Sequence, residues 1–427
     1  MSKIIRVDEI TRVEGYGSIE VEIGSGEVLG VKMNISEGPR FFESLVKTVK
    51  YDKVPDIMRR ICAICTATHT LASIAAIEKA FKVDVTPQTR NLRDLLINGE
   101  MIESHALHLY FLALPDILGY PDAVAMTDKY MEQVKIALQL KKAGNMIHNT
   151  LGGREVHGMN ERVGGFASLP TDDTLLEIKT ALVDSRPAAE LAVKLFSEAE
   201  IPTYAKSENN LMALDTGKRF GFTGNYILTS QAGRYPAEDY LRLTNEKTFK
   251  HSNAKFSTFQ GKPFVVGALS RMLLNGSKLE GAAAELYKEN YDRLDSNNIL
   301  TNNLAQAIEL LHSVDRSIQI IDELVSTGIQ EEGLAEFETH SSRGVGTIEA
   351  PRGILYHDYA FDEEGRITKA NVITPTAQNV ANMEKDYRVA AGRLIKEPDY
   401  KIRESLEIIA RAYDPCISCS VHLVKCP

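Results

Sequence analysis

The sequence has no long apolar run, no basic tract and little glycine or proline, and each absence excludes a class of protein. Its apolar runs near Pro263–Leu269 and Leu107–Leu114 fall far below the roughly 18 residues that a membrane-spanning helix requires. Lysine and arginine total 49 against 58 acidic residues, so the chain lacks the clustered cations that nucleic-acid binding needs. With 29 glycines and 15 prolines among 427 residues, the composition is globular rather than disordered or collagen-like.

The start of the chain also lacks the apolar segment of a secretory signal. Met1–Glu9 alternate charged residues with isoleucine and valine. We therefore expect a cytoplasmic protein with no membrane span and no nucleic-acid partner, unless a partner carries an export signal. No internal repeat, low-complexity tract or flexible linker divides the chain, so residues 1–427 are expected to form a single domain.

Hydrophobic periodicity predicts a mainly α protein with small β elements, an α+β fold centred on a helical bundle. Strands are predicted at Ser18–Ile23, Glu27–Ile35, Gly346–Ala360 and Arg366–Ile373. Helices are predicted at His69–Phe81, Pro87–Leu114, Thr127–Leu151, Thr171–Ala199, Leu279–Leu294, Asn302–Ser326, Ala377–Leu394 and Tyr400–Ala412. Pro115 is expected to end the strongest of these helices. Residues 200–262 carry a weak signal, which predicts an irregular segment lying on the surface.

Only five cysteines are present, and four of them form two Cys-x-x-Cys pairs near opposite ends of the chain. The pairs are Cys62 with Cys65 and Cys416 with Cys419. In a reducing compartment such pairs bind metal or carry out redox chemistry more often than they form structural disulfides. Each pair can chelate, and together they supply four thiolates.

The separation of the two pairs favours a catalytic metal site. Structural zinc sites usually join pairs that are roughly 15 to 20 residues apart, whereas these pairs lie at opposite ends of the chain. A catalytic metal at the centre of a domain often draws ligands from such distant segments, so we expect a metal site between the N-terminal and C-terminal segments. A structural zinc and two independent thiol redox pairs are the alternatives.

The segments around both pairs, Arg60–His69 and Asp414–His422, resemble the paired signatures of nickel–iron hydrogenase large subunits. The likeness continues in family order through Ile10–Gly15, Glu37–Glu43, Glu103–His108, Glu349–Gly353 and Ile373–Asn379. It is strongest to the soluble cytoplasmic class that works with NAD(P) or related carriers and includes sulfhydrogenase-type enzymes. The resemblance implies a catalytic subunit that cleaves H2 reversibly into protons and electrons.

The resemblance also implies a particular metal centre. A nickel would be held by four thiolates, with Cys62 and Cys416 as terminal ligands. Cys65 and Cys419 would bridge to an iron that carries carbon monoxide and cyanide. Soft thiolates suit both metals. Heterolytic cleavage of H2 further needs a base, which is either a terminal thiolate or Arg352, although arginine normally stays protonated.

Other residues match positions around that centre. Glu14 matches a glutamate that passes protons outward from a terminal cysteine. Glu43 and His422 match the ligands of a second metal, commonly magnesium, although iron or manganese would accept the same ligands.

Three more matches concern the iron and the thiolates. Arg352, together with Pro375 and Thr376, matches residues that surround the diatomic ligands of the iron, and cyanide accepts hydrogen bonds. His69 would orient a thiolate as a hydrogen-bond donor.

The chain departs from the family pattern in two places near the site. Ala63 stands where many relatives have glycine, and Ser104 stands where other classes have aspartate, so the charge partner of Arg352 is expected to differ. Five residues follow His422, where most relatives have a longer extension that is removed, and we expect Cys426 to be a free thiol.

Four of the five cysteines are assigned to the metal centre, and the one that remains cannot by itself hold an iron–sulfur relay. Electrons must therefore leave through a partner, and the resemblance implies a small iron–sulfur subunit followed by flavin and iron–sulfur diaphorase subunits that reduce NAD(P). The chain has no dinucleotide-binding fingerprint of its own. A hydrogen-sensing subunit and a non-catalytic zinc-binding subunit are the rival functions.

Overall fold

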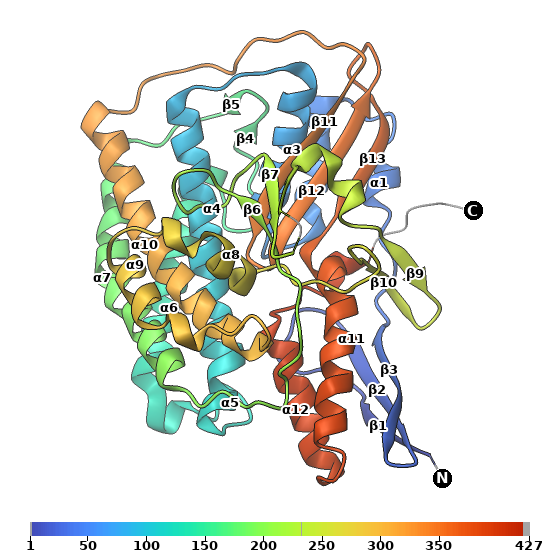
Figure 1. The fold of residues 1–427 in the computed structure, drawn as a ribbon. Helices are drawn as coiled ribbons and strands as arrows, with labels where there is room; N and C mark the ends of the chain where they lie inside the picture. Colours follow the sequence, from blue (N-terminus) through green and yellow to red (C-terminus); the bar gives the residue numbers. More distant parts are fainter. Residues whose placement is uncertain (1, 232, 422–427) are drawn as a thin grey trace.

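Helices dominate the computed structural model, which describes residues 2–231 and 233–421. Four long helices pack side by side as a bundle, on the left of Figure 1: α4 (Pro87–Leu107), α6 (Thr127–Ile147), α7 (Asp172–Glu198) and α10 (Asn302–Thr327). Apolar residues at spacings of three and four, such as Leu92 and Leu96 of α4, are fully buried between them. Two shorter helices, α8 (Ala268–Asn275) and α9 (Gly281–Glu289), pack against α10.

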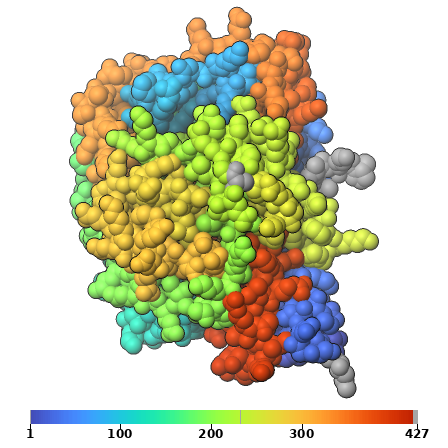
Figure 2. Space-filling view, viewed as in Figure 1, coloured from blue at the N-terminus to red at the C-terminus, as the bar shows by residue number. Residues whose placement is uncertain are grey.

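Two antiparallel sheets and the helices that cover them form the other half of the molecule. The N-terminal sheet has the order β1 (Lys3–Val7), β2 (Gly17–Gly24) and β3 (Glu27–Ile35), and it packs against α11 (Pro375–Arg393) and α12 (Asp399–Ala412). The C-terminal sheet consists of β11 (Ser342–Ala350), β12 (Gly353–Phe361) and β13 (Ile367–Ile373), and it packs against α3 (Thr66–Phe81). The two ends of the chain are thereby interleaved, and Figure 2 shows the red C-terminal helices lying against the blue N-terminal sheet.

Smaller elements complete the described part of the chain. They are the helices α1 (Phe42–Leu45), α2 (Val54–Met58) and α5 (Leu114–Leu118), and the strands β4 (Glu161–Arg162), β5 (Gly165–Phe166), β6 (Met212–Asp215), β7 (Tyr226–Thr229), β8 (Gly233–Pro236), β9 (Lys247–Phe249) and β10 (Ser252–Phe256). Within the described ranges, no helix combines the length and apolar character needed to cross a membrane.

The predicted fold class is confirmed, but two element predictions were wrong. The single strand expected at residues 346–360 is a hairpin of β11 and β12, and Arg352 lies in its turn. Pro115 does not end a helix, because α4 continues through a π-helical segment at His108–Ala113 and Pro115 then lies in the first turn of α5. A second π-helical segment, His148–Gly152, continues α6.

The prediction of an irregular, surface-lying segment at residues 200–262 was also wrong. It contains the three-stranded sheet β6–β8 and the β9–β10 hairpin. Met212, Leu214 and Ile227 of this sheet are fully buried, and they belong to a core cluster that also contains Ile354 and Tyr356 of β12. The strands are only four residues long, too short for alternation to distinguish them from loops.

The crossing of α3 and β11 yields a prediction about stability. A Cβ atom on Gly346 would lie 2.0 Å from the carbonyl oxygen of Ala72 and 2.6 Å from the backbone nitrogen of Ala76. We expect Gly346→Ala to lower the free energy of unfolding by about 1–3 kcal/mol, because the added methyl group forces helix and strand apart. Gly221→Ala is the control, since no described atom lies within 4 Å of its added Cβ. Equal urea midpoints for the two variants would contradict the prediction.

Candidate metal centre

The sulfur atoms of the two cysteine pairs meet in the interior, within 4.8 Å of one another. The Sγ atom of Cys62 lies 3.5 Å from that of Cys416 and 3.0 Å from that of Cys65. The sulfur atoms of Cys416 and Cys419 are joined as a disulfide in this structure, so this pair must be reduced before it can bind a metal as thiolates. Each of the four side chains is at most 4% exposed. The structure thus brings together the four sulfur atoms that the spacing of the two pairs suggests.

Short helical turns hold each pair in this position. Cys62 follows the 3₁₀ turn η2 (Arg59–Ile61), and Cys65 is the residue that begins α3. The backbone N–H of Cys65 donates to the sulfur of Cys62 at 3.2 Å. In the second pair, the N–H of Cys419 donates to the carbonyl oxygen of Cys416 at 3.2 Å. Both sulfurs of a pair therefore face the same side of its turn.

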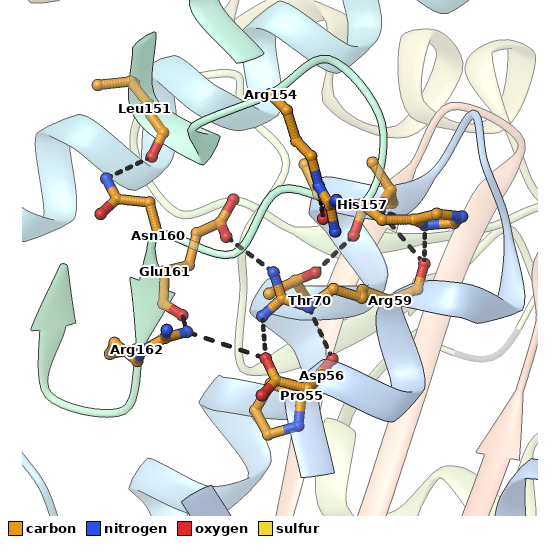
Figure 3. A network of polar contacts seen from close by, with 12 residues as sticks. Pro55, Asp56, Arg59, Thr70, Leu151, Arg154, His157, Asn160, Glu161 and Arg162 are labelled. Carbon is orange, nitrogen blue, oxygen red and sulfur yellow. Dashed lines mark hydrogen bonds and ion pairs between the residues drawn. The ribbon is translucent and has the colours of Figure 1, made fainter. Parts of the chain in front are cut away.

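A buried ion pair anchors the turn before Cys62 (Figure 3). Arg59 is fully buried, and its guanidinium lies 3.3 Å from Glu161 and 3.1 Å from Asp56. His157 contacts the carbonyl oxygen of Arg59 at 2.9 Å through its Nδ1 atom. This network ties η2 to α2 and to β4, which fixes the approach of the chain to the first cysteine pair.

Glu14 lies beside the second pair, as the resemblance implied. Its backbone pairs with Cys416 in a parallel bridge, and its carbonyl oxygen accepts from the N–H of Ile417 at 3.0 Å. Its carboxylate accepts hydrogen bonds from the N–H of Ser418 at 3.1 Å and from the Ser418 hydroxyl. Gly15 has a φ of +86°, and any side chain there would collide with Ile417 and Glu37. This close approach explains why glycine follows Glu14.

Arg352 reaches the site from the β11–β12 turn and is 4% exposed. Its Nε and Nη2 atoms donate to the backbone oxygen and the carboxylate of Asp414 at 2.9 and 2.8 Å. Its Nη1 atom donates to the Ser104 hydroxyl at 2.9 Å. Burial alone would lower the pKa of Arg352, but the neighbouring acidic groups, chiefly Asp414, together raise that pKa. Asp414 is thus the charge partner, with Ser104 as a neutral acceptor.

Pro375 and Thr376 begin α11 directly against the second cysteine pair, and both are buried. The Thr376 hydroxyl oxygen accepts from the N–H of Cys416 at 3.0 Å. The neighbouring Thr374 hydroxyl donates to the carbonyl oxygen of Cys419 at 2.9 Å. These contacts fix the backbone of both cysteines, so the segment that includes Pro375 and Thr376 supports the sulfur cluster.

Glu43 is buried on α1, and only one of its two carboxylate oxygens forms hydrogen bonds with described residues. Its Oε1 atom accepts from the N–H of Val372 at 3.1 Å and from Lys255 at 3.3 Å. Its Oε2 atom is buried without a hydrogen-bond partner among the described residues. A free carboxylate oxygen in the interior suits a hard divalent cation such as magnesium. The other predicted ligand, His422, and Cys426 lie outside the described residues.

His69 is buried on α3, one helical turn after Cys65. Its backbone N–H donates to the carbonyl oxygen of Cys65 at 3.1 Å. Its Nδ1 atom lies 3.1 Å from Nε2 of His357 on β12. Burial lowers the pKa of His69 to about 3, with a further contribution from Arg40, so the ring is neutral near pH 7. The contact with His357 fixes the ring against the sheet.

Three residues near the cluster were missed by the sequence analysis. Asp414 and Thr374 lie inside or next to segments of the resemblance, but nothing in their spacing showed that they contact Arg352 and Cys419. Glu100 is a fully buried carboxylate on α4. It follows Leu96 by four positions, so a charged residue beside the apolar stripe of the helix was the available signal.

The donor set fits soft transition metals. Four buried sulfurs at mutual contact distance are the ligands that nickel, iron or zinc would accept. The hydrogen bond from the Cys65 thiol lowers the pKa of Cys62, and the same contact, together with burial, raises the pKa of Cys65. One thiolate in the interior is thus stabilised by a neighbouring thiol and by the charge of Arg352.

Comparison with known proteins assigns the family. The model of the family described as nickel-dependent hydrogenase matches residues 40–136 and 198–422. The chain is 43% identical to sulfhydrogenase 2 subunit alpha of Pyrococcus furiosus, over 99% of this chain and 100% of that protein. It is 41% identical to sulfhydrogenase 1 subunit alpha of the same organism, over 99% of this chain and 98% of that protein.

Solved structures agree with this assignment. The structure of an NAD+-reducing [NiFe]-hydrogenase in the H2-reduced state superposes with a TM-score of 0.89 at 25% identity, over 98% of this chain and 99% of that chain. A [NiFeSe]-hydrogenase of Dm. baculatum shares the fold, with a TM-score of 0.80 at 23% identity over 99% of this chain and 100% of that chain. With the family model, the relatives and the four meeting cysteines in agreement, the chain belongs to the family of nickel–iron hydrogenase large subunits.

Proposed function

We propose that Cys62, Cys65, Cys416 and Cys419 together hold a nickel–iron pair at which this hydrogenase subunit catalyses H2 ⇌ 2H⁺ + 2e⁻. One observation carries the proposal: four buried sulfurs from opposite ends of the chain lie within 4.8 Å of one another. When bound, the metals supply a Lewis acid and a redox centre for heterolytic cleavage. In this proposal all four cysteines would hold the nickel, and Cys65 and Cys419 would hold the iron as well.

We assign separate positioning and proton-transfer roles to the residues around the cysteines. Arg352 is held by Asp414 and Ser104, and its raised pKa keeps it protonated. It therefore acts as a fixed cation and hydrogen-bond donor, and a terminal thiolate rather than Arg352 takes the first proton. Glu14, which touches the backbone beside Cys416, passes that proton outward.

Further assignments rest on the positions of the supporting residues. Arg352, Pro375 and Thr376 would surround the carbon monoxide and cyanide ligands of the iron, and a buried guanidinium would suit cyanide as a hydrogen-bond acceptor. Glu43 offers its free Oε2 atom to a second metal, with His422 as the proposed second ligand. Magnesium is our choice for this metal because a hard cation prefers carboxylate oxygen, and iron or manganese are the alternatives.

Electron transfer requires a partner in this account. The sulfurs of the described cysteines all belong to the metal centre, so we propose a small iron–sulfur subunit and then flavin and iron–sulfur diaphorase subunits. The similar proteins named as alpha subunits of sulfhydrogenases and as an NAD+-reducing hydrogenase support this arrangement. NAD(P) is the proposed acceptor, which agrees with a cytoplasmic location because that carrier is used there.

The ligand assignment predicts the outcome of Cys416→Ser. A hydroxyl is a poor ligand for a soft metal, so the variant should retain less than about a tenth of the nickel bound by the native chain. Elemental analysis of the purified complex measures this loss. Cys426→Ser is the control, because that cysteine is predicted to be a free thiol and its loss should leave nickel in place. A Cys416→Ser protein with full nickel and native activity would refute the assignment.

The role of Glu14 predicts a selective kinetic defect. Glu14→Gln keeps the contacts to Ser418 but cannot carry a proton, so the metals should remain while isotope exchange between H2 and D2O slows by about 100-fold. Mass spectrometry of the evolved gas measures the exchange. Glu9→Gln changes an exposed glutamate nearby and should exchange at the native rate. Native exchange in Glu14→Gln would remove Glu14 from the proton path.

The three hydrogen bonds donated by Arg352 predict how the Arg352→Lys substitution changes turnover. Arg352→Lys keeps the positive charge. Its single ammonium group cannot reach the Ser104 hydroxyl, the backbone oxygen of Asp414 and the Asp414 carboxylate in the geometry of the guanidinium. We expect a folded, metal-containing enzyme whose kcat falls by roughly 100-fold or more, as with loss of one preorganised donor. Arg343→Lys, at an exposed ion pair with Asp358, is the matched control. Unchanged turnover in Arg352→Lys would exclude Arg352 from the mechanism.

A further inference from the structure

Glu100 is a buried carboxylate that has no ion-pair partner among the described residues. It is fully buried on α4, and no described lysine, arginine or histidine forms an ion pair with it. Its partners are neutral: Oε2 accepts from the N–H groups of Ala67 and Thr68 at 2.7 and 3.2 Å, and Oε1 accepts from the Thr68 hydroxyl at 2.6 Å. An unpaired buried carboxylate is costly, and such groups concentrate at functional sites.

The position of Glu100 links it to the cysteine site. Ala67 and Thr68 form the first turn of α3, which begins at Cys65. The Thr68 hydroxyl also lies 3.3 Å from the carbonyl oxygen of Cys65. Ser104, one turn further along the same face of α4, contacts Arg352. Glu100 therefore lies on the face of the bundle that meets the first turn after Cys65, whereas Glu14 contacts the backbone of the second pair.

His148 and Glu103 lie between Glu100 and the surface. His148 begins the π-helical segment after α6 and is 2% exposed. Its Nδ1 atom lies 3.3 Å from Glu103, whose other oxygen accepts from the partly exposed Lys141 at 2.8 Å. Among the described residues, neither ring nitrogen of His148 has a hydrogen bond of good geometry. The ring can therefore bind a bridging water.

Two glycines bring these groups together. A Cβ atom on Gly144 of α6 would lie 2.8 Å from the carbonyl oxygen of Gly99 and 2.9 Å from the backbone nitrogen of Glu103. The two helices are therefore in backbone contact at this point. His148 follows Gly144 by one helical turn, and Glu100 follows Gly99 directly, so the close contact places the ring beside the acidic face of α4.

We propose that Glu100, His148 and Glu103 form a second proton route from the cysteine site to the surface at Lys141. The inference rests on the proposed hydrogenase function. A proton released from H2 binds the Glu100 carboxylate, leaves it for the His148 ring through a bridging water, and then passes to Glu103 and to solvent. Each group returns to its starting form, and the two electrons leave separately through the partner subunit.

The charges around Glu100 agree with this role. Burial raises the pKa of Glu100 to about 7, so the carboxyl can both accept and release a proton near neutral pH. Burial lowers the pKa of His148, but the neighbouring carboxylates, chiefly Glu103 and then Glu100 and Glu161, together raise it. The charge of Glu100 contributes to the raised pKa of Cys65. Glu161 forms an ion pair with Arg59 at 3.3 Å.

The competing role is purely structural, because the same hydrogen bonds make Glu100 a cap for the first turn of α3. Glutamine separates the two roles, since its amide can keep the contacts to Ala67 and Thr68 but carries no exchangeable charge. The test is made on the assembled complex in the Glu14→Gln background, where exchange through the first route is blocked. Variants of Glu100, Glu103 and the exposed Glu132 are compared there.

We expect Glu14→Gln/Glu100→Gln and Glu14→Gln/Glu103→Gln to exchange isotope between H2 and D2O about 100-fold more slowly than Glu14→Gln alone. Glu14→Gln/Glu132→Gln should match Glu14→Gln. The second route is overturned if Glu14→Gln/Glu100→Gln also matches Glu14→Gln, or if only Glu100→Ala slows exchange, since the residue is then a cap. A wild-type complex that exchanges no isotope would instead contradict the proposed function and the route together.

An infrared titration tests the same group without turnover. In the full chain purified without nickel, a carboxylic-acid band that disappears as the pH rises through about 7 should be present in the native protein and missing in Glu100→Gln. Glu246 has a pKa raised to about 7 as well, chiefly by burial, so the difference between the two proteins isolates Glu100. Identical titrations of the native and Glu100→Gln chains would overturn the route.

Discussion

Four cysteine sulfur atoms, two from near each end of the chain, must be buried within 4.8 Å of one another. Sequence separation adds little to the entropic cost of such a closure, because that cost grows only with the logarithm of loop length. The larger demand is to bury groups that become thiolates, since buried charge is stable only beside compensating charge. The interleaved N-terminal sheet and C-terminal helices bring the two ends of the chain together. The charge of Arg352 helps to compensate a buried thiolate.

Charge compensation organises the layers beneath the site. Arg352 is balanced by Asp414. Behind it, the buried Arg271 binds Glu309 and Glu349 and also donates to the backbone oxygens of Ala350 and Pro351 at 3.0 Å, which holds the turn that carries Arg352.

Two buried carboxylates are less completely compensated than these pairs, although Glu43 does contact Lys255 at 3.3 Å. Glu43 keeps one oxygen without a hydrogen-bond partner among the described residues, and Glu100 has only neutral partners. These two positions are where the account places a divalent cation and a mobile proton. The same physical requirement, that a buried charge be neutralised, accounts for the ion pairs and is the reason we propose functions for Glu43 and Glu100.

Much of the site could be predicted from the sequence because its chemistry lies in short local motifs. The cysteine pairs and Glu14 each sit in such a motif, and the structure brings both pairs and Glu14 together. The partners of Arg352 could not be predicted, because Ser104 and Asp414 meet it only through the packing of α4, the hairpin turn and the C-terminal segment. Periodicity also failed where burial overrides it: a π-helical segment carries α4 past its expected end, and the short strands of residues 200–262 proved to be core.

The central claim, that sulfur atoms from both ends of the chain surround one metal, can be tested by X-ray absorption at the nickel edge of the purified complex. The account predicts a nickel with four sulfur neighbours, one for each of Cys62, Cys65, Cys416 and Cys419, and a nearby iron. Nickel surrounded mainly by nitrogen and oxygen, or a protein that holds zinc and no nickel, would contradict it.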